Sequence, residues 1–154
     1  MLKSKIFQLA AVSLFFSCLG ISQSLNEKYD SILAKKYGAD DYGMKNYILV
    51  LLKTGTAQIQ DKAKVSELFA GHMSNIGKLV DERKMIVAGP LAKNELYRGI
   101  FILDMTDLEE AKILMDTDPA IKAGLLEPIL LKWYGSAALP SYLENAFKVG
   151  KYRF

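Results

Sequence analysis

The chain has 154 residues, of which 51% are hydrophobic and 24% are charged, and its formal net charge at neutral pH is +3. This length is typical of one domain, and the composition excludes a disordered chain. Lys3 and Lys5 lie in a segment that we expect to be removed, and without them the net charge falls from +3 to about +1. That charge excludes a nucleic-acid binder that works by neutralising many phosphates.

The first 24 residues have the pattern of a signal peptide. Met1–Lys5 carries two lysines and no acidic residue, and an almost wholly apolar run follows over Ile6–Gly20. The run is shorter than the roughly 20 residues of a membrane-spanning helix, and small residues follow it, as they do at a cleavage site. We therefore predict a signal peptide over residues 1–24, cleaved near Ser22–Ser24, and export to the periplasm or out of the cell.

The only cysteine, Cys18, lies within this segment. The pair Ser17-Cys18 after an apolar run could instead be a lipoprotein cleavage site, which would leave the mature chain anchored to a membrane through Cys18. The bulky Phe15 and Phe16 and the continuation of the apolar run to Ile21 argue against that alternative. If Cys18 is removed, the mature chain has no disulfide, thiol nucleophile or thiolate metal ligand.

Residues 25–43 predict a helix followed by a linker. Apolar side chains at helical spacing fall on one side of Asn26–Tyr37, Gly38 ends the helix, and Gly38–Gly43 is polar. At the other end of the chain, residues 136–154 predict a helix over Pro140–Phe147 and a short tail.

Residues 44–135 predict one domain with the element order β-α-β-β-α-β. Apolar runs bounded by turn residues predict strands, and apolar residues at helical spacing predict helices. The expected strands are Tyr47–Leu52, Met85–Ala88, Gly99–Asp104 and Ile129–Tyr134. The expected helices are Asp61–Asp81, a second one opened by Thr106, and a short turn that begins at Asp118-Pro119 and ends at Gly124. This order is that of the ferredoxin-like α+β fold, with a four-stranded antiparallel sheet.

Two details of this domain are predicted from single residues. The second helix should begin with a capping box, in which the Thr106 hydroxyl accepts from an early backbone N–H and Glu109 reaches back. Pro128 cannot donate to a strand ladder, so the last strand should lie at an edge or contain a bulge.

The strands are apolar on both of their faces, as the runs YILVLL and IFIL show. Two helices can cover only one face of a four-stranded sheet. We expect a second copy of the chain to cover the other face, sheet against sheet, which gives a closed two-fold dimer. The flanking segments are the competing cover.

Few residues offer chemistry. The chain has no glycine-rich phosphate loop and no GxSxG motif, and with one histidine we expect no metal site and no cofactor. That histidine, His72, lies on the apolar stripe of the first domain helix, where both ring nitrogens need partners. It is either a structural histidine with satisfied nitrogens or a general acid/base at the floor of a pocket.

Asp118 also has two interpretations. An aspartate before a proline is a common helix start, with Asp118 as N-cap and Pro119 in the first turn. The same carboxylate could orient the imidazole of His72. Trp133 is expected in the core or an interface because it alternates with Ile129 and Leu131.

These residues resemble the YCII-related domain over Met44–Gly135. The matching features, in chain order, are YILVLLKTG, Gly71-His72-Met73 within a helix, VAGPL, RGIFIL, DLEEAKILM, TDPAIKAGLL and Lys132-Trp133-Tyr134. The resemblance implies a ferredoxin-like fold paired into a dimeric α/β barrel. It also implies His72 and Asp118 as a catalytic pair. The architecture is shared with muconolactone isomerases, and one enzyme of this kind removes chloride from a chlorinated hydroxyquinol.

Two functions follow as hypotheses. The first is a cofactor-free enzyme of isomerase or lyase type, in which His72 moves a proton on a cyclic or aromatic small molecule and Asp118 holds the ring. The second is a non-catalytic small-ligand-binding or assembly module. Export, the added helix and the added tail depart from the resembled family, whose members are mostly cytoplasmic and short.

Overall fold

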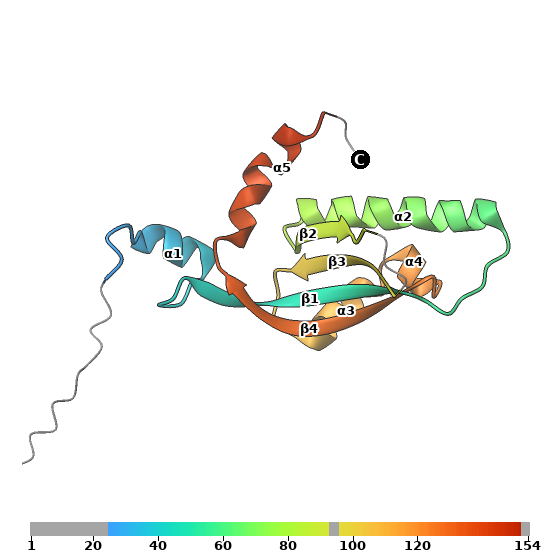
Figure 1. Cartoon of the computed structure of the whole chain (residues 1–154), viewed down its shortest axis with the longest axis horizontal. Helices are drawn as coiled ribbons and strands as arrows, with labels where there is room; N and C mark the ends of the chain where they lie inside the picture. The colour runs from blue at the N-terminus through green and yellow to red at the C-terminus, as the bar shows by residue number, and fades with distance from the viewer. Residues whose placement is uncertain (1–24, 93–95, 152–154) are drawn as a thin grey trace, which may run out of the picture.

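The computed structural model describes residues 25–92 and 96–151, so the predicted signal peptide and Cys18 lie outside the described residues. Its helices are α1 (Ser31–Tyr37), α2 (Lys62–Asp81), α3 (Leu108–Met115), α4 (Pro119–Lys122) and α5 (Leu143–Val149), with a 3-10 turn η1 at Leu139–Tyr142. Its strands are β1 (Met44–Thr54), β2 (Met85–Pro90), β3 (Tyr97–Leu103) and β4 (Leu126–Ser136). Figure 1 shows α2 lying along the sheet and α1 and α5 extending from one end.

The four strands form one antiparallel sheet in the order β2-β3-β1-β4. This order, with α2 between β1 and β2 and α3 between β3 and β4, is the predicted ferredoxin-like βαββαβ fold. Strand β4 is an edge strand that pairs with β1 along its whole length, and Pro128 lies in it opposite Leu52. The prediction that the strand of Pro128 lies at an edge is therefore confirmed.

Aspartates set the starts of the helices. The carboxylates of Asp30, Asp61, Asp107 and Asp118 accept hydrogen bonds from backbone N–H groups in the first turns of α1, α2, α3 and α4. The prediction that Thr106 caps α3 was wrong, because Asp107 Oδ1 accepts from the backbone N–H of Glu110 at 2.9 Å. An aspartate is a stronger N-cap than a threonine, and the helix therefore begins one residue later.

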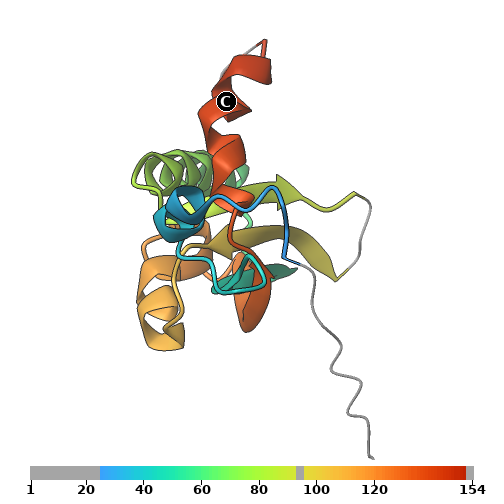
Figure 2. The same cartoon turned by 90° about the vertical axis from the view of Figure 1, so that its left-hand side faces the viewer.

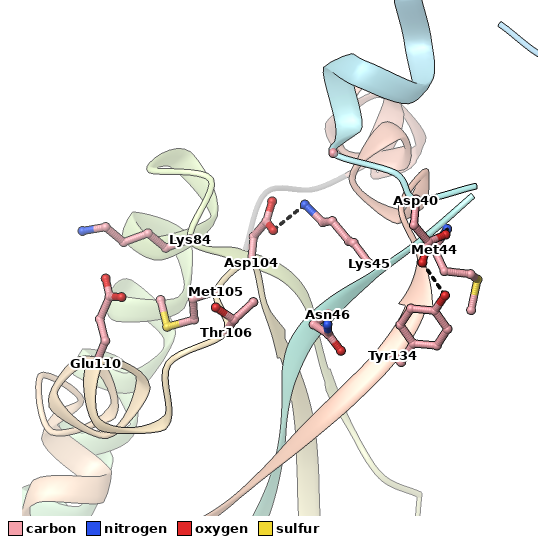
Figure 3. Close-up of a pocket in the computed structure, with 11 residues that line it drawn as sticks. Asp40, Met44, Lys45, Asn46, Lys84, Asp104, Met105, Thr106, Glu110 and Tyr134 are labelled. Carbon is pink, nitrogen blue, oxygen red and sulfur yellow. Dashed lines mark hydrogen bonds and ion pairs between the residues drawn. The ribbon is translucent and has the colours of Figure 1, made fainter. Parts of the chain in front are cut away.

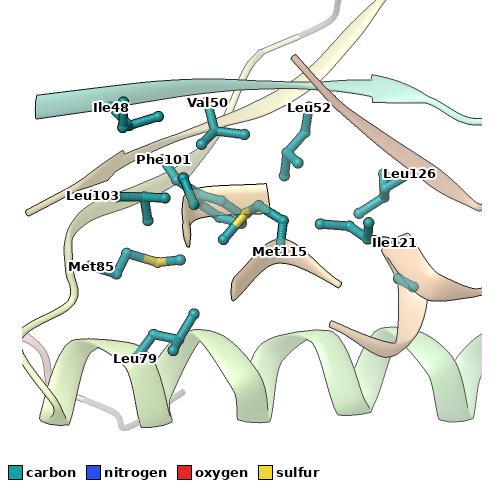
Figure 4. Close-up of a cluster of buried hydrophobic side chains, with 12 residues drawn as sticks. Ile48, Val50, Leu52, Leu79, Met85, Phe101, Leu103, Met115, Ile121 and Leu126 are labelled. Carbon is teal, nitrogen blue, oxygen red and sulfur yellow. The ribbon is translucent and has the colours of Figure 1, made fainter. Parts of the chain in front are cut away.

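The main hydrophobic core lies between one face of the sheet and the helices α2, α3 and α4. Its fully buried members include Ile48, Val50 and Leu52 of β1, Phe101 and Leu103 of β3, Leu79 of α2, and Met115 of α3. Figure 4 shows these side chains meeting between the strands and the helices. At about 25 cal/mol for each Å² of apolar surface buried, this cluster is the main favourable contribution to folding.

The other face of the sheet is only partly covered. The C-terminal residues Leu139 and Leu143 pack on its buried residues Tyr47, Ile86 and Ile102. Trp133 packs beside them, with its ring centroid 5.6 Å from that of Tyr47, which confirms its expected place in a core.

The remainder of that face lacks a cover within the described residues. The side chains of Leu49, Leu51, Ile100 and Ile129 are only partly buried, and Leu131 is 43% exposed. Because β1, β3 and β4 pair in register, these residues lie together on the side of the sheet that faces away from α2.

The added segments meet at one end of the sheet (Figure 2). Lys36 of α1 pairs with Glu144 of α5 at 3.6 Å, and the Tyr134 hydroxyl donates to Asp40. Neither α1 nor α5 contains a buried residue. The expected helix over Asn26–Tyr37 is shorter, because Asp30 caps it, and Gly38 ends it with φ +67° as predicted.

The expected helix over Pro140–Phe147 is divided between η1 and α5. Among the described residues, no helix combines the length and the apolar character that crossing a bilayer requires.

Candidate functional site

His72 lies near the middle of α2, on the side of the helix that faces the sheet. Its ring stands edge-on to Phe69, with centroids 6.1 Å apart, and tilted by 33° against Phe101 at 6.0 Å. Only 11% of the side chain is exposed. The predicted position on the buried stripe of the helix is therefore confirmed, and the imidazole has aromatic neighbours from α2 and from β3.

Asp118 lies at the start of α4 and is almost fully buried. Its Oδ1 accepts from the backbone N–H groups of Ala120 at 2.9 Å and Ile121 at 3.2 Å. Its Oδ2 lies 2.7 Å from Nδ1 of His72. Each oxygen therefore has its own partner, and both geometries expected for this carboxylate are present at once: it is the N-cap of α4 and it holds the imidazole.

The second ring nitrogen of His72 is in a different situation. Nε2 has no hydrogen-bond partner among the described residues, whereas no fully buried side-chain nitrogen or oxygen in that part of the chain lacks one. Nε2 therefore reaches solvent. The imidazole is therefore held through one nitrogen and accessible at the other.

The turn before α4 is fastened to α2 by a second contact. The Thr117 hydroxyl lies 3.3 Å from Asn75 Oδ1 and donates to the carbonyl of Leu114 at 2.7 Å. Asn75 is one helical turn after His72, so neighbouring residues of α2 meet neighbouring residues of this turn. The two elements that supply the pair are therefore held together at more than one point.

A cavity lies elsewhere, where β1 begins. It has a volume of about 620 Å³ and is lined by Asp40, Lys45, Lys84, Asp104, Glu110 and Tyr134, among others. Figure 3 shows the side chains of Lys45 and Asp104 pointing toward one another, with Lys45 Nζ 2.6 Å from Asp104 Oδ1. The hydrogen bond from Tyr134 lowers the pKa of Asp40 from its usual value.

A second cavity of about 460 Å³ is lined by residues that include Lys112, Asp116, Ile121 and Leu126. Neither cavity is lined by His72 or Asp118. The pocket expected beside the pair is therefore not one of these two cavities. No cluster of three or more histidine, cysteine, aspartate or glutamate side chains suited to a metal ion occurs within residues 25–92 and 96–151.

Sequence reasoning missed the larger cavity, although a signal for it was present. Lys45 stands two residues before the apolar run YILVLL, and Asp104 directly follows the run IFIL. In antiparallel neighbours, the start of one strand lies beside the end of the other. The pairing of Ile48 with Leu103 brings these two charges together.

Comparison with known proteins gives one family match. The model of the YCII-related domain family matches residues 47–133, which include His72 and Asp118 but neither α1 nor α5. No curated protein is similar enough in sequence to match. Among solved structures, the 5-chloro-2-hydroxyhydroquinone dehydrochlorinase TftG from Burkholderia phenoliruptrix AC1100, in complex with 2,5-dihydroxybenzoquinone, is similar with a TM-score of 0.41. The two chains are 19% identical, over 56% of this chain and 92% of that one.

Proposed function

Because the chain belongs to the YCII-related domain family, we propose that it is a small-molecule enzyme in which His72 moves a proton and Asp118 holds the imidazole. One observation supports this role most directly. His72 is bound to a buried carboxylate through Nδ1 at 2.7 Å, while its Nε2 is open to solvent. A proton-transfer group requires one nitrogen that a reactant can reach, and Nε2 meets that requirement.

The carboxylate selects the useful tautomer. When Nδ1–H donates to Asp118, the lone pair of the neutral ring lies on Nε2, where it can accept a proton from a bound molecule. The ring that has taken up the proton stays hydrogen-bonded to Asp118 through Nδ1–H. Return of the proton to another atom of the same molecule is an isomerisation. In an elimination, the electrons of the broken C–H bond form a double bond, and a leaving group departs with its own bonding electrons.

The aromatic neighbours of the imidazole fix its position. Phe69 and Phe101 lie about 6 Å from the imidazole, centroid to centroid. Because Phe101 is buried in the core and Phe69 packs against the core, the two rings hold the imidazole in place while its Nε2 stays open to solvent. Neither step needs a metal or an organic cofactor, because the proton donor and acceptor are the imidazole and the reactant.

Exchange of carbon-bound hydrogen tests this proposal without knowledge of the natural reactant. The protein is incubated in D₂O with cyclic ketones, lactones and hydroxyquinones, and deuterium incorporation is followed by NMR. We expect exchange above the buffer rate for at least one class, and a loss of roughly 100-fold or more in His72→Asn. Met73→Leu, an exposed neighbour on the same helix, should behave as the unaltered protein. Equal rates for His72→Asn and the unaltered protein would contradict the role.

An assembly role is the second candidate, and it has its own support. The partly covered sheet face includes Leu131, and on the added helices Ile32, Phe147 and Val149 are each more than 70% exposed. Such surfaces typically mark interaction sites. We propose that the sheet face is covered by a second copy of the chain, which is compatible with the enzymatic role as well.

We also propose that the mature protein works outside the cytoplasm. The support is the sequence of residues 1–24, with its basic start, short apolar run and small residues before Leu25. A small-molecule enzyme in that compartment would meet compounds before they reach the cytoplasm.

A further inference from the structure

Three successive contacts join α2 to the start of α4. His72 meets Asp118, Asn75 meets Thr117, and Gly71 lies against Pro119. The last contact exists because residue 71 has no side chain. A Cβ atom at this position would lie 2.9 Å from Cγ and 3.3 Å from Cβ of Pro119.

We propose that Gly71 is a positioning residue, whose missing side chain lets Pro119 rest against α2 and thereby sets the distance between His72 and Asp118. Carbon atoms in contact prefer separations of about 3.5 to 4.0 Å. A Cβ at residue 71 would therefore force the proline ring back by about half an ångström or more. The ring cannot turn aside, because it is closed on its own backbone nitrogen.

Such a displacement would be felt directly by the pair. Pro119 is the first residue of α4 and Asp118 is its N-cap, so the two residues move together. An increase of half an ångström would lengthen the 2.7 Å contact between Nδ1 and Oδ2 to about the limit of a good hydrogen bond. The imidazole would then lose the partner that fixes its tautomer.

A second glycine in the same helix provides the matched control. Gly77 lies six positions after Gly71, and a Cβ atom there would meet nothing within 4 Å. Alanine is the better helix former at an interior position. Gly71→Ala and Gly77→Ala thus add the same methyl group to the same helix, and only the first one meets Pro119.

The imidazole itself reports the outcome. The chain contains one histidine, so long-range ¹H–¹⁵N correlation spectra of the full mature protein show a single imidazole. In the unaltered protein and in Gly77→Ala we expect the tautomer protonated at Nδ1, with its proton at low field. In Gly71→Ala we expect a mixture of tautomers and loss of the low-field proton. An unchanged spectrum in Gly71→Ala would overturn the proposal.

A double variant separates this effect from general damage to the fold. Pro119→Ala removes the Cγ atom that the new methyl group would meet, and leaves a 3.3 Å contact that a shift of a few tenths of an ångström relieves. The double variant, Gly71→Ala with Pro119→Ala, should therefore recover the Nδ1–H signal. It tests the contact even if Gly71→Ala alone folds poorly. Failure of the double variant to recover it would count against Gly71 as the positioning residue.

The expected effect of Gly71→Ala on turnover rests on the proposed function. Its expected effect on the tautomer of His72 does not. Once a reactant is identified, Gly71→Ala should lower kcat more than it changes KM, because a displaced base affects the chemical step. If His72→Asn leaves turnover unchanged, the proposed function fails. The positioning role still stands if the imidazole spectra of Gly71→Ala and Gly77→Ala differ as described above.

Discussion

Nδ1 of His72 and Oδ2 of Asp118 lie 2.7 Å apart, although 46 residues separate them in the chain. The same carboxylate caps α4 through Oδ1. One residue therefore contributes to two properties, the stability of α4 and the orientation of the imidazole. Substitutions at this position can separate the two.

Asp118→Asn should keep the cap and lose the orientation, because asparagine caps a helix as well as aspartate does. Thermal unfolding should then show a loss of at most about 1 kcal/mol. The imidazole of His72 should no longer be held in the tautomer protonated at Nδ1. An ionised carboxylate can only accept a hydrogen bond from Nδ1, whereas an amide can also donate one to it.

Asp118→Ala removes both functions of the carboxylate. We expect a loss of about 2 to 4 kcal/mol in unfolding free energy, from the missing cap and from the buried imidazole nitrogen left without a partner. Denaturant titration measures the loss. If Asp118→Ala were no less stable than Asp118→Asn, the carboxylate would not be the cap that holds α4.

Alkaline pH should destabilise the protein through Tyr47. Burial, with a smaller contribution from Asp104, raises the pKa of Tyr47 to about 12 from an ordinary value of 10.0. The unfolded chain therefore releases this proton first as the pH rises. The stability that Tyr47 provides is complete below pH 10 and is lost between pH 10 and about pH 12, by roughly 2 to 3 kcal/mol.

Tyr47→Phe isolates this contribution from that of the other tyrosines. The variant loses the hydrogen bond from the Tyr47 hydroxyl to the Ser136 carbonyl, which should lower stability by about 1 kcal/mol at pH 7. Its unfolding free energy should then fall less steeply than that of the unaltered protein between pH 10 and 12. Parallel curves in that range would show that Tyr47 ionises normally in the fold.

The partly covered sheet face should make the mature protein a dimer. Sedimentation at micromolar concentration should give about twice the monomer mass. Leu131→Lys places a charge on that face and should yield folded monomers, because an unpaired charge is costly to bury. The control is Ile113→Lys, because Ile113 is also exposed but lies on α3, away from that sheet face. This variant should stay dimeric. If the unaltered protein is a monomer, the C-terminal segment alone covers enough of the sheet face to keep the fold stable, and the dimer is wrong.

Export should leave a shortened chain. Mass spectrometry of the protein purified from its own cells should find an N-terminus near Ser22 to Leu25, or a lipidated Cys18. The two outcomes differ in fractionation, since only the lipidated form stays with membranes. An intact chain that begins at Met1 and is found in the cytoplasm would disprove export.

The fold was predictable because each strand carries its own signal. The runs at Tyr47–Leu52 and Gly99–Asp104 are continuous, apolar and bounded by turns, so their position depended on no distant contact. The start of α3 was missed because two good capping residues, Thr106 and Asp107, stand side by side. The local sequence pattern does not show which of the two residues caps the helix. The hydrogen bond from the Glu110 N–H to Asp107 in the folded chain does.

The candidate site was predictable only in part. The periodicity of α2 placed His72 on the buried side, and the family resemblance suggested Asp118 as its partner. Neither could indicate that Nε2 remains open or that Gly71 rests on Pro119, because both facts depend on how closely α4 approaches α2. Such a spacing is a tertiary property, and no periodicity along the chain encodes it.

The pairing of β1 with β4 separates the two ends of the domain. Met44 lies opposite Ser136, and ten residues later Thr54 lies opposite Leu126, so about 33 Å of strand lies between these ends. Helix α1 is at the first end and α4 at the second (Figure 1). A tether attached ahead of Leu25 would therefore hold the molecule by the end remote from Asp118. An immobilised or fused form of the protein should then keep its α4 end facing away from the support.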